Sequence, residues 1–294
     1  MLFVANYTMK GSLQALIATI LLAILSVFFS PFGVLLGAVI ALVTLRIGEI
    51  EGFKTLMVAM VTSFALSSFV LGNTLTSVLA VFEYMLPVWI IALVLRKTNS
   101  LSSAIHVSML MAGGSIAVFH LFVGDTVTWW SELFNSVLLP VMTEAEMDIP
   151  AEAVENIANI ATLAFGMSAI FLWVSIAFIA RWWQSQLYYP GKFGESFYQV
   201  RLPNSIAYLA IVVIIASLVV KSAFIQDLAG VMTAGLLFVG LAIAHHAISI
   251  KKMSKAWLVS LYVLLVLFPQ TILIVSAIGL ADIWLNIRSR WTKD

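Results

Sequence analysis

Cysteine is absent from this sequence of 294 residues, and charged residues are scarce. Without cysteine the chain forms no disulfide, no thiolate metal site and no cysteine nucleophile. Only 10% of its residues are charged, whereas soluble domains carry about 25%. The formal net charge is +1, so the overall charge gives no indication of a nucleic-acid partner.

Apolar side chains are abundant instead, at 62% of the sequence. No soluble core could bury so much apolar surface, so the expected partner is the lipid bilayer. A spanning helix needs about 20 apolar residues. The sequence therefore predicts about nine or ten transmembrane segments in a single transmembrane domain over residues 1–294.

Apolar runs separated by charged or turn residues give the predicted spans. They lie at about 12–29, 33–45, 54–71, 75–95, 104–123, 158–180, 204–220, 228–249 and 257–286. Helices are expected because the runs lack the alternation of barrel strands. The first run is too long for a signal-peptide core and is expected to be a retained helix. The predicted fold class is all-α, a polytopic helical membrane protein.

The basic residues predict a cytoplasmic N-terminus. In that orientation Lys221 alone lies outside, and the following residues lie inside: Lys10, Arg46, Lys54, Arg96, Lys97, Arg181, Lys192, Arg201, Lys251, Lys252 and Lys255. The acid-rich segment at about 124–157 becomes an outer loop, and the aromatic, basic segment at about 181–203 becomes an inner loop.

The last apolar run, 257–286, is too long for one ordinary span, and Pro269 interrupts it. We expect a hairpin of two short helices, which would return Arg288 and Arg290 to the cytoplasmic side. The alternative is one long, tilted helix with a proline kink. Asp282 is expected to pair with Arg288 or Arg290, or to cap a helix.

The outer loop contains an amphipathic pattern. Apolar residues recur there at helical spacing: Trp130, Leu133, Phe134, Val137 and Leu138. A helix at the outer membrane interface is therefore predicted, ending at Pro140. It would serve either as an interfacial cap or as a lid over an outward-facing cavity.

The inner loop reads RWWQSQLYYPGKFGESFYQVRLP. One interpretation is a docking site for a protein partner, with these candidate contacts: Arg181, Trp182, Trp183, Tyr188, Tyr189, Phe193 and Arg201. The other is an aromatic belt at the headgroup level with basic anchors.

Glu83 is the clearest charge within a predicted span, where it costs about 2.5–3.5 kcal/mol on insertion scales. It would either bind a cation, a proton or a polar solute group, or form a structural hydrogen bond to a neighbouring helix. Pro87, one turn further on, frees a backbone carbonyl nearby. His120 also lies toward the outer half, so Glu83 and His120 are the predicted solute contacts.

Catalytic motifs do not appear in the sequence: it has no P-loop, no GxSxG and no HExxH. No catalytic residue, cofactor or metal site is predicted. Whether the chain is an enzyme stays open, and the missing nucleophile and base weigh against it.

Three stretches resemble a known family. They are YYPGKFGESFYQVRLP, the C-terminal run from GLAIAHHAISIKK to GLADIWLNIRSR, and the proline-broken N-terminal pair around SPFG. They are similar to the YybS-like membrane proteins of the DUF2232 family. The resemblance covers most of the chain and implies a multi-pass protein of the bacterial inner membrane.

That family has been likened to the substrate-binding S components of energy-coupling-factor vitamin transporters, which implies small-solute binding. This chain departs from them in its larger number of spans and its acidic outer loop. The leading hypothesis is transport-related binding of a small solute within the bundle, with or without partner subunits. The alternative is a scaffold that recruits proteins through its inner loop and tail.

Overall fold

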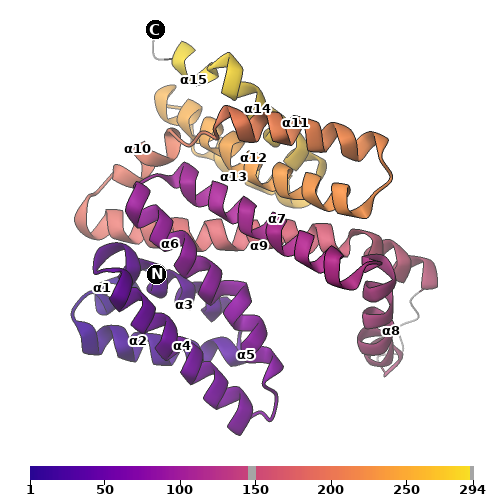
Figure 1. Ribbon diagram of the computed structural model, residues 1–294. Coiled ribbons are helices and arrows are strands. Elements are labelled where there is room, and N and C mark those ends of the chain that lie inside the picture. The colour runs from indigo at the N-terminus through magenta and orange to yellow at the C-terminus, as the bar shows by residue number, and fades with distance from the viewer. Residues whose placement is uncertain (145–149, 292–294) are drawn as a thin grey trace. The chain divides into compact units, whose positions relative to one another are not determined.

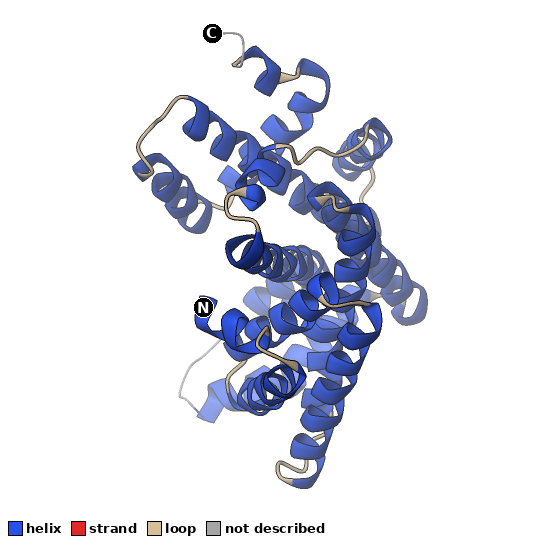
Figure 2. Cartoon of the chain, turned by 90° about the vertical axis from the view of Figure 1, so that its left-hand side faces the viewer, coloured by secondary structure: helices blue, strands red, loops and turns tan. Residues whose placement is uncertain are grey.

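The computed structural model describes residues 1–144 and 150–291, and every regular element in these ranges is a helix (Figure 2). Residues 145–149 of the predicted outer loop, which include Glu146 and Asp148, lie outside the described residues. The chain forms two compact units. Unit 1 comprises Met1–Ser108 and Phe171–Arg201, and unit 2 comprises Met109–Ile170 and Leu202–Asp294.

Unit 1 is built mainly from the N-terminal helices (Figure 1). Its elements are α1 (Leu2–Thr8), α2 (Ser12–Phe28), α3 (Pro31–Arg46), α4 (Glu49–Phe69), α5 (Leu75–Ala80), a π-helical segment (Val81–Met85), α6 (Leu86–Thr98), the start of α7 (Leu101–Val123), the end of α9 (Ala151–Tyr188) and α10 (Lys192–Tyr198).

The core of unit 1 is α3. Pro31 occupies the first turn, where its missing N–H and fixed φ suit a helix start. Every residue from Leu36 to Leu45 is buried, because α2, α4, α6 and the π-helical segment pack around it. A helix that is apolar on every side is suited to such burial.

Unit 2 contains the other part of α7, the first part of α9 and the C-terminal helices. The latter are α11 (Asn204–Val219), α12 (Ala223–Ile250), α13 (Ala256–Leu267), α14 (Gln270–Leu285) and α15 (Ile287–Arg290), with α8 (Thr126–Glu144) between α7 and α9. Its core is α12, which is buried continuously from Gly230 to Ile243.

The chain reverses at Phe268 and Pro269, as the hairpin prediction requires. Phe268 is extended, with φ −129° and ψ 91°. Beyond the break, the Ser276 hydroxyl donates to the Thr233 carbonyl at 2.9 Å, and the Trp291 ring stacks on His246 with centroids 6.1 Å apart. In both contacts the residue that is later in the first segment meets the residue that is later in the second segment. Helix α14 therefore runs parallel to α12.

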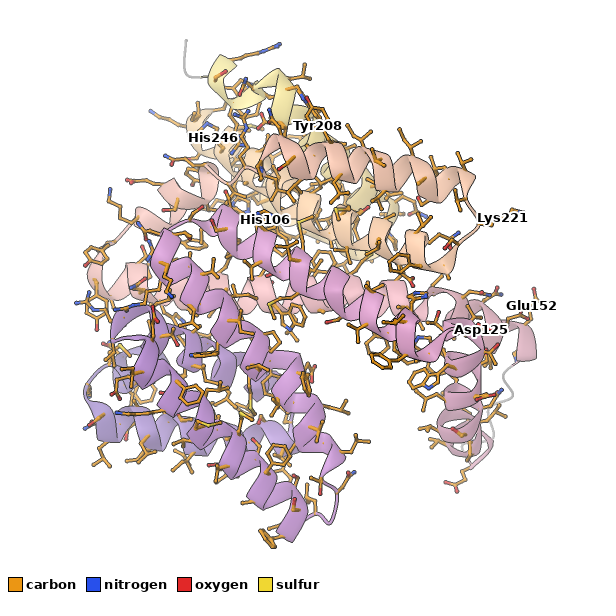
Figure 3. All side chains as sticks on the ribbon, viewed as in Figure 1. His106, Asp125, Glu152, Tyr208, Lys221 and His246 are labelled. Atoms are coloured by element: carbon orange, nitrogen blue, oxygen red, sulfur yellow. The ribbon has the colours of Figure 1, made fainter. Side chains whose placement is uncertain are left out.

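A single helix following α12 would run antiparallel to it, so the hairpin of α13 and α14 is confirmed. The Lys251 ammonium lies 5.6 Å from the centroid of the Trp291 ring. The two ends that meet there, those of α12 and α15, therefore share one end of unit 2. Figure 3 shows His246 toward that end, and Asp125, Glu152 and Lys221 toward the other.

The surface of both units is apolar, as a chain solvated by lipid requires. Phe69 is 90% exposed, and Phe122 is 82% exposed. Five described helices are long and apolar enough to cross a membrane: Glu49–Phe69, Leu75–Thr98, Leu101–Val123, Glu152–Tyr188 and Ala223–Ile250. The remaining predicted runs form shorter apolar helices: Ser12–Phe28, Pro31–Arg46, Asn204–Val219, Ala256–Leu267 and Gln270–Leu285. The predicted all-α polytopic fold is confirmed.

The predicted amphipathic helix in the outer loop is α8, but its predicted end at Pro140 is wrong. The helix continues through Pro140 to Glu144. A proline in a helix leaves one carbonyl without its donor, here that of Ser136. Ser136 is exposed, so water can replace the lost bond and the helix need not stop.

Asp125 begins α8. Its carboxylate accepts hydrogen bonds from the backbone N–H groups of Val127 and Thr128 at 3.1 Å each, and from the Thr128 hydroxyl at 2.7 Å. These bonds, the Thr128 hydroxyl foremost, hold the pKa of Asp125 below its usual range. Trp130 anchors the helix to α9: its indole N–H donates to the Thr162 hydroxyl at 2.9 Å, and its ring stacks on Phe165.

The predicted inner loop at 181–203 begins too early. Helix α9 continues to Tyr188, so Arg181, Trp182, Trp183 and Tyr188 lie on its last two turns. The helix persists because the stretch holds no glycine or proline before Pro190. Its side chains also find partners inside unit 1, as described next.

Candidate functional site

A polar pocket of about 590 Å³ lies in unit 1, where the C-terminal ends of α3, α6 and α9 meet α10. Four of its lining residues are basic: Arg46, Arg96, Arg181 and Lys192. Four more are neutral and polar: Asn99, Gln184, Ser185 and Ser196. Leu45, Tyr189 and Phe193 complete the wall. The predicted topology places all four cations on one side of the membrane.

Arg96 holds the end of α3. Its guanidinium donates to the carbonyl oxygens of Thr44 at 3.0 Å and Leu45 at 2.8 Å. Carbonyls in the last turn of a helix lack intrahelical donors and carry the negative end of its dipole, so a cation is stabilising there. Arg96 is therefore largely a structural residue of the pocket wall.

Arg181 joins α9 to the end of α6. It donates to the Gln184 amide oxygen at 2.6 Å and also to the side-chain oxygen of Asn99. Asn99 can serve because it ends α6 in the left-handed conformation, at φ 53°, which asparagine tolerates. The positive charge of Arg181 is thus held in place by neutral groups.

Arg46 lies at the end of α3, against two consecutive tyrosines, Tyr188 and Tyr189, at the end of α9. Its guanidinium carbon is 3.9 Å from the centroid of the Tyr188 ring, which is a cation–π contact. It also donates to the Tyr189 hydroxyl at 3.4 Å. These contacts position the charge without neutralising it.

Ser185 fixes the turn that closes the pocket. Its hydroxyl donates to the Tyr189 carbonyl at 2.9 Å and accepts from the Phe193 N–H at 3.0 Å. Lys192 pairs with Glu195 at 3.0 Å, and both side chains are about two-thirds exposed. Such an exposed pair is worth little, so Lys192 stays available at the rim.

Among the residues that the structure describes, no acidic side chain lines the pocket. Within residues 1–144 and 150–291, neither Arg46, Arg96 nor Arg181 forms an ion pair with a carboxylate. Arg181 is partly buried, whereas Arg46 and Arg96 are exposed. A partly buried cation without an opposite charge is unfavourable unless an anion can join it. The arrangement suits a negatively charged ligand.

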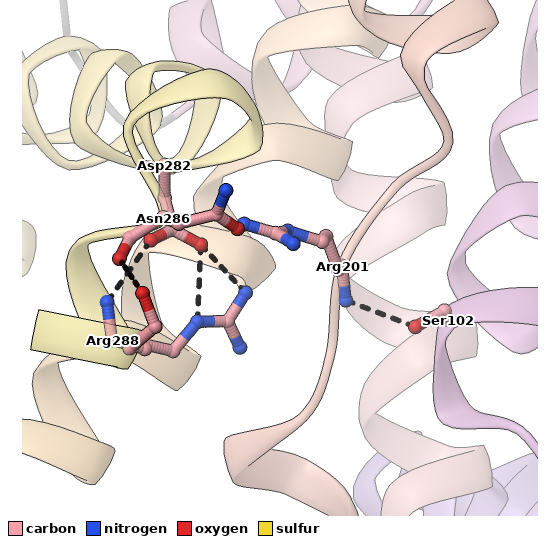
Figure 4. A network of polar contacts seen from close by, with 6 residues as sticks. Ser102, Arg201, Asp282, Asn286 and Arg288 are labelled. Atoms are coloured by element: carbon pink, nitrogen blue, oxygen red, sulfur yellow. Dashed lines mark hydrogen bonds and ion pairs between the residues drawn. The ribbon is translucent and has the colours of Figure 1, made fainter. Parts of the chain in front are cut away.

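The predicted docking residues have different positions in unit 1. Arg181, Tyr189 and Phe193 line the pocket. Tyr188 supports Arg46, whereas Trp183 is fully buried. The Arg201 backbone N–H donates to the Ser102 hydroxyl at 3.0 Å (Figure 4). Whether these residues bind a partner stays a prediction.

The predicted solute contacts Glu83 and His120 belong to different units, and their role stays a prediction. Glu83 lies in the π-helical segment with its side chain exposed. Its carbonyl oxygen, freed by Pro87, accepts from the Trp173 indole N–H at 2.7 Å. π-Helical segments frequently mark functional sites.

His120 has a partner that is not among the residues predicted from the sequence, Asp227. Its Nε2 is 2.6 Å from the Asp227 carboxylate, with side-chain exposures of 14% and 4%. Asp227 immediately precedes the predicted span 228–249. The available signal was that an acid so close to an apolar run requires a partner.

Asp282 pairs with Arg288, one of its two predicted partners. The Arg288 Nε and Nη2 atoms lie 3.0 and 2.7 Å from the same carboxylate oxygen (Figure 4). No group of three or more histidine or acidic side chains that could hold a metal ion occurs in the described part of the chain.

The sequence model of a family described as "Predicted membrane protein (DUF2232)" matches residues 17–283. No curated protein and no solved structure matches this chain.

Proposed function

We propose that this chain, which belongs to the DUF2232 family of predicted membrane proteins, binds a small solute in the cationic pocket of unit 1 as part of a transport process. The protein is embedded in a membrane through several apolar helices. The bacterial plasma membrane is its proposed location, as the family resemblance implies.

One observation carries the proposal: three arginines line the pocket, and among the described residues their partners are neutral. The volume of about 590 Å³ falls within the usual range for ligand pockets, about 300–1,000 Å³. Because the donors are already in position, fewer side chains have to be ordered on binding, and the entropic cost of binding is lower.

Native mass spectrometry of the protein, extracted gently from its own membrane, tests this function. We expect a reproducible small-molecule adduct that is lost in Arg181→Gln. Lys97→Gln is the matched control, since Lys97 lies beside Arg96 at the end of α6 but does not line the pocket. The variants Glu83→Gln and His120→Ala test whether the two other predicted contacts take part in binding the adduct.

An adduct that persists in Arg181→Gln but disappears in Glu83→Gln would move the binding site to the π-helical segment. The absence of any small-molecule adduct in the wild-type protein would contradict solute binding. A stoichiometric protein partner without an adduct would favour the scaffold alternative, whose proposed contacts include the exposed Tyr189.

A further inference from the structure

We propose that the ligand of this pocket carries a phosphoryl group, which Arg46 and Arg181 bind together. The inference rests on the proposed function, because it concerns the same pocket, and it adds the chemical class of the ligand. Its source would be either the headgroup of an anionic phospholipid or a soluble organic phosphate.

The charge of the pocket points to an anion with several acceptor oxygens. Arg46, Arg96 and Arg181 come from three different helices and line one cavity, whose described lining residues include no acidic side chain. Carboxylates and phosphates both form bidentate pairs with arginine, but clusters of several arginines are the usual binding sites of phosphorylated groups. A pocket lined by three arginines therefore favours phosphate.

The hydrogen bonds of the three arginines show which of their N–H donors remain available to a ligand. Arg96 is engaged by two carbonyls of α3, so it supplies mainly long-range charge. Arg181 has five N–H donors, and it uses them on only two neutral acceptors, Gln184 and Asn99. Arg46 uses one N–H on the Tyr189 hydroxyl. Arg46 and Arg181 thus retain donors for a ligand.

The size and position of the pocket indicate that the phosphoryl group belongs to a larger molecule. A cavity of about 590 Å³ exceeds what inorganic phosphate alone would fill, and Leu45, Tyr189 and Phe193 offer apolar surface to the remainder. The pocket lies at the basic ends of apolar helices. Basic pockets between transmembrane helices on the cytoplasmic side are suited to phospholipid headgroups.

The full-length protein is tested in phosphatidylcholine nanodiscs, with and without phosphatidylglycerol, and separately with sn-glycerol 3-phosphate. Binding of the phosphoryl probe is measured by native mass spectrometry. We expect the affinity to fall about tenfold or more in Arg181→Gln, as is usual for a lost charge-assisted hydrogen bond. Lys97→Gln should stay within about twofold, since it changes an exposed ion pair with Glu49.

Arg46→Gln is the second variant, in case Arg181→Gln disturbs folding. Arg46 is exposed at the chain surface, and surface changes have small effects on stability. It should weaken the phosphoryl probe about as much as Arg181→Gln. Unchanged binding in both variants would overturn the proposal.

Retention of phosphatidylglycerol that glycerol 3-phosphate does not displace would support the lipid source. Binding of glycerol 3-phosphate without lipid retention would support the soluble source. If neither phosphoryl probe binds but another adduct is lost in Arg181→Gln, the phosphoryl inference fails and solute binding stands. If the wild-type protein shows no adduct and binds neither probe, both fail.

Discussion

His120 and Asp227 bring two ionisable side chains into contact inside unit 2, at 2.6 Å. The pair is asymmetric, because histidine can be buried in its neutral form, whereas a lone buried carboxylate is costly. We therefore expect His120→Ala to destabilise the folded protein by about 3–5 kcal/mol, the usual penalty for breaking a buried pair. Thermal unfolding in a mild detergent would measure the loss.

The double variant His120→Ala with Asp227→Asn supplies the control for this prediction. It removes the buried charge together with its partner, so it should be more stable than His120→Ala alone. A double variant that only adds the two losses would show that the contact carries no coupling energy.

The Trp173 indole donates the hydrogen bond to the Glu83 carbonyl that Pro87, which lacks a backbone N–H, cannot donate. In unit 1 the Glu83 carbonyl has no N–H four residues ahead, and the Trp173 indole donates to it at 2.7 Å. Trp173→Phe should therefore destabilise the protein by about 1–3 kcal/mol, as expected when a partly buried acceptor loses its donor.

Trp89→Phe is the matched comparison for Trp173→Phe. The Trp89 indole N–H is buried and has no hydrogen-bond partner in the described part of the chain. The same change of side chain there removes no hydrogen bond. Equal losses of stability in the two variants would contradict the role assigned to Trp173.

At the scale of elements, α12 and α14 approach each other through glycine. A Cβ on Gly240 would meet the Val275 carbonyl, and one on Gly279 would meet the Leu236 carbonyl. Because the obstacle is backbone, neither helix can yield by changing a rotamer. Gly240→Ala should destabilise unit 2 by about 1–3 kcal/mol, the usual range for overpacking.

Gly114→Ala is the control for this crossing. Gly114 also lies within a helix, but a Cβ there would meet no side chain or neighbouring helix within 4 Å among the described residues. Alanine is the better helix former by about 0.5–1 kcal/mol, so this variant should be neutral or slightly more stable. A drop in melting temperature for Gly114→Ala alone would contradict the packing argument.

At the scale of the whole molecule, the absence of cysteine gives a direct test of topology. The hairpin places Met253 and Arg290 at the same end of unit 2, and Lys221 follows α11 at the other. Membrane-impermeant maleimide should therefore label Met253→Cys and Arg290→Cys from one side and Lys221→Cys from the opposite side. The unmodified chain gives the background.

Labelling of Met253→Cys and Arg290→Cys from opposite sides would refute the hairpin. The N-terminal orientation is tested in the same experiment. With a cytoplasmic N-terminus, Lys221→Cys should react in intact cells, and the other two should react only in inverted vesicles.

Much of the fold can be predicted from the sequence, because a segment enters lipid when its own residues are apolar, and such runs are visible in the sequence. Each predicted apolar run is helical, and Pro269 marks a real reversal between two helices. Pro140 was misjudged because its effect depends on whether water reaches the freed carbonyl. The end of α9 was misjudged because its aromatic residues pack inside unit 1, as the buried Trp183 does.

The candidate site could be identified only from the tertiary structure. The basic residues pointed to one side of the membrane, but not to one pocket. Arg181 and Asn99 are 82 residues apart in sequence, His120 and Asp227 are 107 apart, and Trp173 and Glu83 are 90 apart. Membrane insertion depends on local composition, which the sequence displays directly. Charge compensation depends on which side chains from distant helices come within hydrogen-bond distance, and only packing decides that.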